Sequence, residues 1–253
     1  MGQMDGHGRS ASMNLRAAAR TDVGLKRRAN EDCCIVAADL GVYLVADGMG
    51  GHRAGQVASE IAAQAVVGAL ETLADAAASL TDKLRYSLAA ANREILDTAR
   101  RKPELSGMGT TLVALLAASG RVALAHVGDS RAYLIRAERI RQLTDDHSLV
   151  AELVRRREIT ETAARGHPHR HVLTRALGVR RSVEPDLAEL TPAAGDTFVL
   201  CSDGLTGHVR DSEIAEIAVG AADPDSACEQ LISLANERGG EDNITVLLVS
   251  CTA

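Results

Sequence analysis

Acidic residues recur in this chain beside apolar, strand-like segments. Three such segments end close to an aspartate, at Asp47, Asp129 and Asp203. A fourth, Asp242, stands immediately before the strand-like residues 243–249. One Asp-Gly turn after a strand indicates only a hairpin. Four acids in this position predict a carboxylate cluster assembled from distant parts of the chain.

Such a cluster has a definite chemistry. Several aspartates in one place repel one another unless a cation neutralises them. Carboxylate oxygens are hard ligands, which suit Mg²⁺ and Mn²⁺. The pattern therefore predicts a metal site at the ends of strands.

The glycines after Asp47 do not form a nucleotide-binding loop. A dinucleotide fingerprint would require a third glycine where Arg53 stands. A phosphate-binding loop would require Lys and then Ser or Thr where Gln56 and Val57 stand. Both interpretations fail on spacing.

A protein nucleophile is not indicated either. A phosphate-binding cysteine loop would place Arg six residues after the cysteine, but Gly207 stands six residues after Cys201. The chain also lacks a G-x-S-x-G motif. Ser130 and Ser202 are interpreted as turn residues beside aspartates.

Composition limits the class of protein. The 253 residues have a net charge of -6, so the composition gives no sign of the basic surface that binds nucleic acid. No apolar run approaches the roughly 20 residues that a membrane-spanning helix needs. Five cysteines without a C-x-x-C pair indicate reduced thiols and a cytoplasmic protein. Residues 1–12 are predicted to be a disordered tail, and residues 13–253 one domain.

Hydrophobic periodicity predicts strands interrupted by helix pairs. Long amphipathic helices are expected over residues 54–78 and 81–101, with Thr81 or Asp82 as the cap of the second. A charged stretch, residues 145–171, interrupts the strands and is predicted to be an inserted flap with two short helices. The first is expected to be capped by residues 144–147 and to run to about Arg157, and the second to begin at residues 160–163. This order favours antiparallel sheets covered by helices over a parallel α/β sheet. The remaining elements are expected at residues 14–21, 33–38, 42–46, 112–117, 122–127, 131–136, 183–190, 197–201 and 244–250 as strands, and at residues 211–219 and 224–238 as helices.

The histidines allow two interpretations. His167, His169 and His171 would share one side of an extended segment and could bind a transition metal, but a solvated flap segment is the favoured interpretation. His126 lies within an apolar strand and is interpreted as a core histidine with its polar atoms satisfied.

Seven separated features together resemble the metal-dependent protein phosphatases, the type 2C serine/threonine family, in its compact bacterial branch. The resemblance runs from about Asn14 to Ser250. It implies an α+β fold, a four-layer α-β-β-α sandwich of two antiparallel sheets flanked by helix pairs. The features are Arg27, Glu31-Asp32, Asp47-Gly48, Gly107-Met108-Gly109-Thr110-Thr111, Gly128-Asp129-Ser130-Arg131, Ser202-Asp203-Gly204 and Asp242-Asn243.

By residue, the resemblance implies a two-metal centre of Mn²⁺ or Mg²⁺ with a weaker third site. Asp47 matches the bridging carboxylate and Gly48 a backbone carbonyl ligand. The other implied metal ligands are Glu31 and Asp32 at the second metal, Asp203 and Asp242 at the first, and Asp129, together with Asp203, at the third.

The remaining implied roles concern phosphate and proton transfer. Two cations can bridge one water, lower its pKa and align it with phosphorus, so that no protein nucleophile is required. Arg27 matches the phosphate-binding arginine, and Arg28 is a less favoured candidate. Many eukaryotic members carry His directly after the Asp-Gly pair, where this chain has Met49. A thioether donates no proton, so His52 or a metal-bound water is the candidate acid.

The expected function is hydrolysis of phosphoserine and phosphothreonine in proteins, reversing a cognate bacterial serine/threonine kinase. One alternative is a pseudophosphatase that acts as a binding or regulatory module, although all the metal acids are present. Another is a structural calcium protein, but its ligands would be concentrated in one loop. Nucleic acid and membranes are not expected partners.

Overall fold

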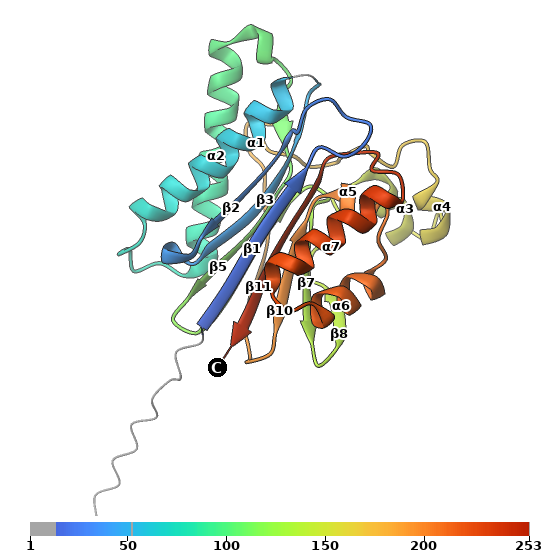
Figure 1. The fold of residues 1–253 in the computed structure, drawn as a ribbon. Helices are drawn as coiled ribbons and strands as arrows, with labels where there is room; N and C mark the ends of the chain where they lie inside the picture. The colour runs from blue at the N-terminus through green and yellow to red at the C-terminus, as the bar shows by residue number, and fades with distance from the viewer. Residues whose placement is uncertain (1–13, 52, 253) are drawn as a thin grey trace, which may run out of the picture.

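The computed structural model describes residues 14–51 and 53–252. Two antiparallel sheets stack face to face, and helices cover both outer surfaces (Figure 1). The predicted α+β sandwich with flanking helices is confirmed. Sheet A has the strand order β1 (Asn14–Asp22), β11 (Ile244–Thr252), β10 (Thr197–Cys201), β7 (Arg131–Arg136) and β8 (Arg139–Gln142).

Sheet B contains the strand that carries Asp47, β3 (Val42–Met49). A two-residue strand, β4 (Gly109–Thr110), pairs with Gly48 and Met49 at the end of this strand. The order of sheet B is β2 (Asp32–Ala37), β3 (Val42–Met49), β5 (Leu112–Ala118), β6 (Arg121–Val127) and β9 (Asp186–Leu190).

Strand alternation divides the core into three layers. In β3, Tyr43 and Val45 pack between the two sheets, whereas Val42 and Leu44 pack against the helices outside sheet B. The outer layer of sheet A packs in the same way on its own helices. Because the core has few aromatic residues, Ala, Val, Leu and Ile fill most of it.

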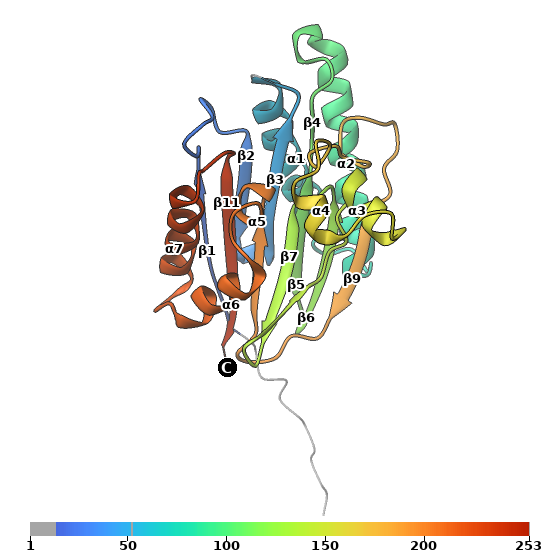
Figure 2. The ribbon, with the colours of Figure 1, turned by 90° about the vertical axis from the view of Figure 1, so that its right-hand side faces the viewer.

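Helix pairs cover each sheet (Figure 2). Sheet B lies under the long helices α1 (Arg53–Thr72) and α2 (Leu80–Arg101), and sheet A lies under α6 (Asp211–Gly220) and α7 (Pro224–Glu237). A single helical turn, α5 (Asp203–Thr206), follows β10 directly. Short 3-10 turns occupy Ala38–Leu40 and Pro103–Leu105.

The segment between β8 and β9, residues 143–185, contains the predicted flap of residues 145–171 and is called the flap from here on. It contains α3 (Leu149–Arg155) and α4 (Glu161–Arg165), and then continues without helix or strand until β9 begins. Ser148 caps α3 by accepting the Ala151 N–H, so the predicted cap at residues 144–147 was placed too early. The second helix begins where it was predicted, and Thr160 caps it by accepting the Ala163 N–H.

Some boundaries differ from the sequence predictions. Helix α1 ends at Thr72, not at residue 78, because the chain turns there toward α2. Ser79 caps α2 by accepting the Asp82 N–H, which corrects the predicted cap at Thr81 or Asp82. The strand predicted from residue 183 begins at Asp186. Within the described ranges, no helix is both long and apolar enough to cross a membrane.

Candidate active site

Two of the acids are cross-strand neighbours in sheet B. Asp32 at the start of β2 stands opposite Asp47 near the end of β3. Because Asp47 continues the row of Tyr43 and Val45, its side chain faces the space between the sheets. Residues that stand opposite each other share a face, so Asp32 faces the same space.

Hydroxyl groups from sheet A hold one oxygen of Asp32. The hydroxyls of Ser202 and Thr245 donate to Asp32 Oδ2 at 2.7 and 2.6 Å. Its other oxygen, Oδ1, is buried without a hydrogen-bond partner. Burial raises the pKa of Asp32 to about 7, because the two hydroxyl donors only partly offset the loss of solvation. The interpretation of Ser202 as a simple turn residue was therefore incomplete.

Asp47 lies where the acids act on one another most strongly. Two threonines fix its backbone: Thr111 Oγ1 accepts the Asp47 N–H at 3.0 Å, and Thr110 Oγ1 donates to its carbonyl at 2.9 Å. Burial is the main cause that raises the pKa of Asp47 well above its usual value. Four further acids add to this rise, namely Asp32, Asp203, Asp129 and Asp242.

Asp129 and Asp203 form a second part of this group. Burial and the charge of Asp203 raise the pKa of Asp129 well above its usual value. Asp203 Oδ1 is buried without a hydrogen-bond partner. His171 of the flap places Nδ1 at 3.6 Å from Asp203 Oδ2, and the Asp203 carboxylate raises the pKa of this imidazole. The flap thus reaches the acids through a histidine of the His-rich segment, which sequence reasoning had assigned to solvent.

Asp242 joins the group from the start of β11. Arg27 Nη2 donates to Asp242 Oδ2 at 2.7 Å. The neighbouring Asn243 ties the Arg27 loop to this corner, since its side chain donates to the carbonyls of Val23 and Ala29. Its Oδ1 also accepts the Glu31 N–H. One amide side chain therefore holds the segment that carries both Arg27 and the Glu31-Asp32 pair.

Glu31 packs against the start of α1. Its carbonyl accepts the Gly48 N–H at 3.2 Å and the Ser59 hydroxyl at 2.6 Å. A Cβ on Gly55 would lie 2.0 Å from Glu31 Oε2 and 2.8 Å from the Gly48 carbonyl carbon. The absence of a side chain at Gly55 thus lets α1 approach the acids closely.

The donor set fits divalent cations. All the side-chain donors among the predicted ligands are carboxylates, two of them have a buried oxygen without a partner, and their proximity raises the pKa of Asp47 and Asp129. A hard cation would satisfy these oxygens and remove the repulsion. Within the described residues, the only three His, Cys, Asp or Glu whose ligand atoms all lie within 4.8 Å of one another are elsewhere, at His126, His147 and Asp186. The acids instead surround Asp47, an arrangement that suits more than one cation with water completing each shell.

The fold and the acids identify the family together with sequence similarity. Residues 13–244 match the family model of protein phosphatase 2C.

The chain belongs to the protein phosphatase 2C family.

Related phosphatases cover nearly the whole chain. The serine/threonine phosphatase Stp of Listeria monocytogenes is 45% identical over 240 residues, which are 93% of this chain and 95% of that protein. The serine/threonine protein phosphatase PstP of Mycobacterium tuberculosis is 43% identical over 92% of this chain and 44% of its own length. A crystal structure of the PstP catalytic domain with two manganese ions superposes with a TM-score of 0.85, at 39% identity over 96% of this chain and all of that chain.

These comparisons establish the chain as a serine/threonine protein phosphatase of the metal-dependent class, which acts on phosphorylated proteins. They do not favour the pseudophosphatase alternative. Two predictions about this phosphatase have different outcomes. His126 is a buried core histidine, and its Nε2 bonds the Asp145 carbonyl at 3.0 Å, as expected. His52, the candidate acid, lies outside the described residues, as do residues 1–12, the predicted tail.

Proposed function

We propose that this phosphatase hydrolyses phosphoserine and phosphothreonine at the acid group, with Mn²⁺ or Mg²⁺ as cofactor. The observation that carries this proposal is the set of mutually perturbed acids around Asp47. The residues that would hold two cations, and a weaker third, are Glu31, Asp32, Asp47, the Gly48 carbonyl, Asp129, Asp203 and Asp242. When bound, the cations supply positive charge to the phosphoryl group and activate water.

The hydroxyl groups among the acids are committed to structural hydrogen bonds. Ser202 Oγ donates to Asp32 and accepts the Thr245 N–H at 3.0 Å. The Thr245 hydroxyl likewise donates to Asp32. Neither hydroxyl is poised as a nucleophile, so water is the attacking group that the site favours. Hydrolysis then breaks the bond between phosphorus and the seryl or threonyl oxygen, and that oxygen takes up a proton.

Arg27 is proposed to bind the phosphoryl group. Its side chain is 52% exposed and reaches Asp242, so the guanidinium lies at the rim of the acids with access to solvent. A guanidinium offers two parallel donors to phosphate oxygens. For the leaving oxygen, His52 is proposed as the acid, with water as the alternative because Met49 cannot donate a proton.

A cavity beside Met49 is suited to the peptide part of the substrate. It has a volume of about 320 Å³ and lies between Met49 and residues 173–184 of the flap. Arg175 and Arg180 contribute positive charge to its wall, and Val179 and Val183 contribute apolar surface. This lining favours a phosphorylated segment with acidic and apolar neighbours of the phosphoresidue.

The activity is tested with a phosphothreonine peptide and p-nitrophenyl phosphate, each assayed in MnCl₂, in MgCl₂ and in EDTA. We expect release of phosphate that requires the divalent cation and is abolished by chelation. A protein that binds the phosphopeptide but does not turn it over with either cation would instead be a binding module.

The phosphorylated proteins on which this phosphatase acts require a kinase that phosphorylates them. Relatives of this length act on serine and threonine phosphate, so we propose that the chain reverses a cognate serine/threonine kinase in the cytoplasm. Phosphoproteomics of a strain that lacks the phosphatase should show increased phosphorylation at sites of one kinase. Loss of these increases on deletion of that kinase would identify the pair, and no change in serine or threonine phosphorylation would refute the proposal.

A further inference from the structure

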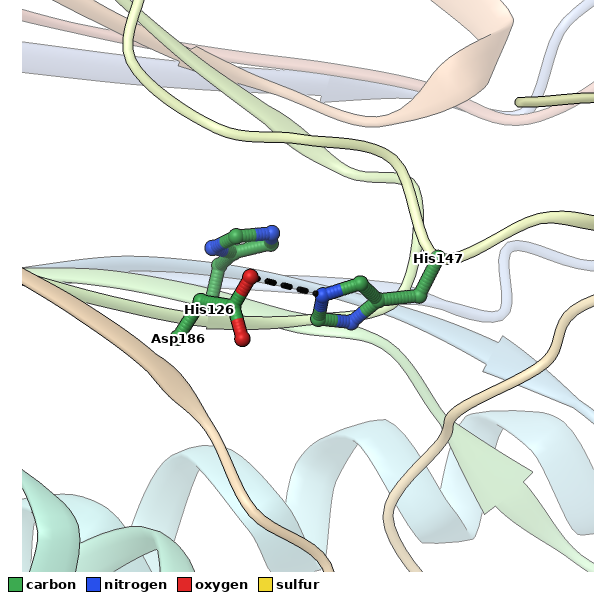
Figure 3. A group of neighbouring side chains, drawn as sticks. All are labelled: His126, His147 and Asp186. Carbon is green, nitrogen blue, oxygen red and sulfur yellow. Dashed lines mark hydrogen bonds and ion pairs between the residues drawn. The ribbon is translucent and has the colours of Figure 1, made fainter. Parts of the chain in front are cut away.

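His147 stands at the base of the flap, beside His126 and Asp186 (Figure 3), and contacts three other segments of the chain. Its N–H donates to the Gly128 carbonyl at 2.9 Å, and its own carbonyl accepts the Thr174 N–H at 2.8 Å. Its ring lies 4.6 Å from the ring of His126, stacked at 21°. Its Nε2 lies 3.2 Å from Asp186 Oδ2. The residue is 2% exposed.

The hydrogen bonds determine which ring nitrogen of His147 carries the proton. The Gly128 N–H points at Nδ1 over 3.1 Å, and a backbone N–H can only donate, so Nδ1 is the acceptor. The proton therefore sits on Nε2 and is donated to Asp186. Arg175 holds the other oxygen of Asp186 at 2.7 Å and fixes the carboxylate.

The same tautomer argues against a metal ion at His126, His147 and Asp186. A cation on Nε2 would displace its proton, and a neutral ring would then carry a proton on Nδ1. That proton would face the Gly128 N–H, which already donates to this nitrogen. The group is built as a hydrogen-bonded unit, not as a metal site.

His147 bonds the backbone of Gly128, the residue that precedes Asp129 of the active site. Gly128 has a φ of +107° and makes two hydrogen bonds to His147, and Asp129 follows it directly. On the other side of Asp129, Ser130 Oγ lies 2.7 Å from Thr111 Oγ1, which accepts the Asp47 N–H. The Asp129 turn is thus held between the flap base and the backbone of Asp47.

We propose that His147 is a positioning residue that fixes the Asp129 turn through Nδ1 and bonds Asp186, the first residue of β9, through Nε2. Because Arg175 of the flap holds the other oxygen of Asp186, this contact links the turn to the flap. The position of the flap and the placement of Asp129 are then coupled through one side chain. For the role of Asp129 as a cation ligand, the inference rests on the proposed function. The geometric link between flap and turn does not depend on it.

Two substitutions separate the two ends of the ring. His147→Asn retains an acceptor near the position of Nδ1 and loses the contact with Asp186. His147→Gln can reach Asp186 but lacks an acceptor near Nδ1. His169→Gln, at an exposed histidine of the flap, is the matched control. The readouts are amide exchange of residues 126–131 in metal-free protein and Mn²⁺ binding by titration calorimetry.

His147→Gln should speed exchange of the Gly128 amide about tenfold and weaken the weakest Mn²⁺ site about tenfold, as loss of an outer-shell partner does. His147→Asn keeps the acceptor near Nδ1, so both values should lie within about threefold of those of the unchanged protein. The remaining difference should equal that of Asp186→Ala, because both variants lose the hydrogen bond between residue 147 and Asp186. Unaltered exchange in His147→Gln, or equal damage in both variants, would overturn the positioning role. If the unchanged protein binds no third Mn²⁺, the assignment of Asp129 fails, while amide exchange still decides the role of His147.

A third variant covers the case in which His147→Gln does not fold. Asp186→Ala removes the β9 carboxylate that joins the His147 ring to Arg175 of the flap, and leaves Gly128 and His147 in place. The link predicts faster exchange of the Gly128 amide by about threefold, because the ring is then free to turn. Exchange equal to that of the unchanged protein would overturn the link to the flap.

Discussion

Asp32 and Asp47 stand directly opposite each other in the antiparallel pair of β2 and β3, with both side chains between the sheets. Like charges in this position destabilise a sheet. Burial, together with the neighbouring acids, raises the pKa of both groups, which favours their protonated forms in the metal-free protein. We therefore expect replacement of Asp47 to lower the phosphatase activity and to raise the stability of the metal-free protein.

Asp47→Asn should abolish activity and stabilise the metal-free protein. Phosphatase turnover should fall on the order of 10³-fold, because several kcal/mol of cation-dependent stabilisation is lost. In EDTA at neutral pH the melting temperature should rise by about 2–4 °C, because an amide occupies this buried position without the cost of either protonating or desolvating a carboxylate. Asp225→Asn, which removes only an exposed ion pair with Arg20, should change neither quantity appreciably. A destabilised Asp47→Asn protein would show that the carboxylate carries no such cost.

The stability of the metal-free protein should fall as pH rises through neutrality. Burial raises the pKa of Asp32 to about 7 from an ordinary value of 3.8. The folded state therefore binds more protons than the unfolded state between these values. The stabilisation is complete below the lower value and is lost as pH rises through the higher one.

The measurement is thermal unfolding in EDTA from pH 5 to pH 8, compared with Asp32→Asn. The melting temperature of the unchanged protein should decline relative to this variant by about 5 °C over the range. Added Mn²⁺ should remove the decline, because a cation neutralises the carboxylates. A constant difference between the two proteins would show that Asp32 does not titrate in this range.

Arg27→Ala should weaken substrate binding and spare the metal site. We expect KM for a phosphopeptide to rise about tenfold, from loss of a charged donor to the phosphoryl group. Mn²⁺ affinity should be equal or higher, because Arg27 neutralises Asp242 in the metal-free protein. Arg28→Ala is the control and should behave as the unchanged protein. Loss of Mn²⁺ binding in Arg27→Ala would refute its assignment to phosphate.

Two glycines of α1 should respond oppositely to alanine. A Cβ at Gly55 would meet Glu31 Oε2 at 2.0 Å, so Gly55→Ala should displace Glu31, lower Mn²⁺ affinity and reduce stability by about 1–3 kcal/mol. A Cβ at Gly68 would meet nothing within 4 Å, so Gly68→Ala should raise the free energy of unfolding by about 0.5–1 kcal/mol. Denaturant unfolding with and without Mn²⁺ measures both effects. Equal changes in the two variants would contradict the close approach of α1 to the acids.

The sequence was sufficient for the main strands and helices because the apolar run of β3 and the helical spacing of α2 are local signals, whereas the four-layer arrangement followed from the family resemblance. It misplaced the end of α1, since the alanines at residues 74 and 76–78 favour helix while the return toward α2 ends it. It did not predict β4 or α5, because elements of two and four residues have no period to detect.

The acids of the site were visible in the sequence because each stands beside a strand, but their supporting groups were not. Ser202 and Thr245 bond Asp32 across 170 and 213 residues of sequence, and Asn243 bonds the Glu31 N–H across 212. Contacts of this range arise only when the two sheets pack together. His147 was likewise noticed only as part of a helix cap, because its partners come from other segments.

Strands β1 and β11 are paired along their whole length, from Asn14 opposite Thr252 to Asp22 opposite Ile244. The second of these pairs adjoins Asp242, whereas the first lies eight residues of β1 away, about 27 Å along the strand. A polypeptide or tether attached beyond Asn14 or Thr252 would therefore start at the end of these strands that is far from the acids. Immobilisation through such an attachment should therefore leave the acids accessible to substrate.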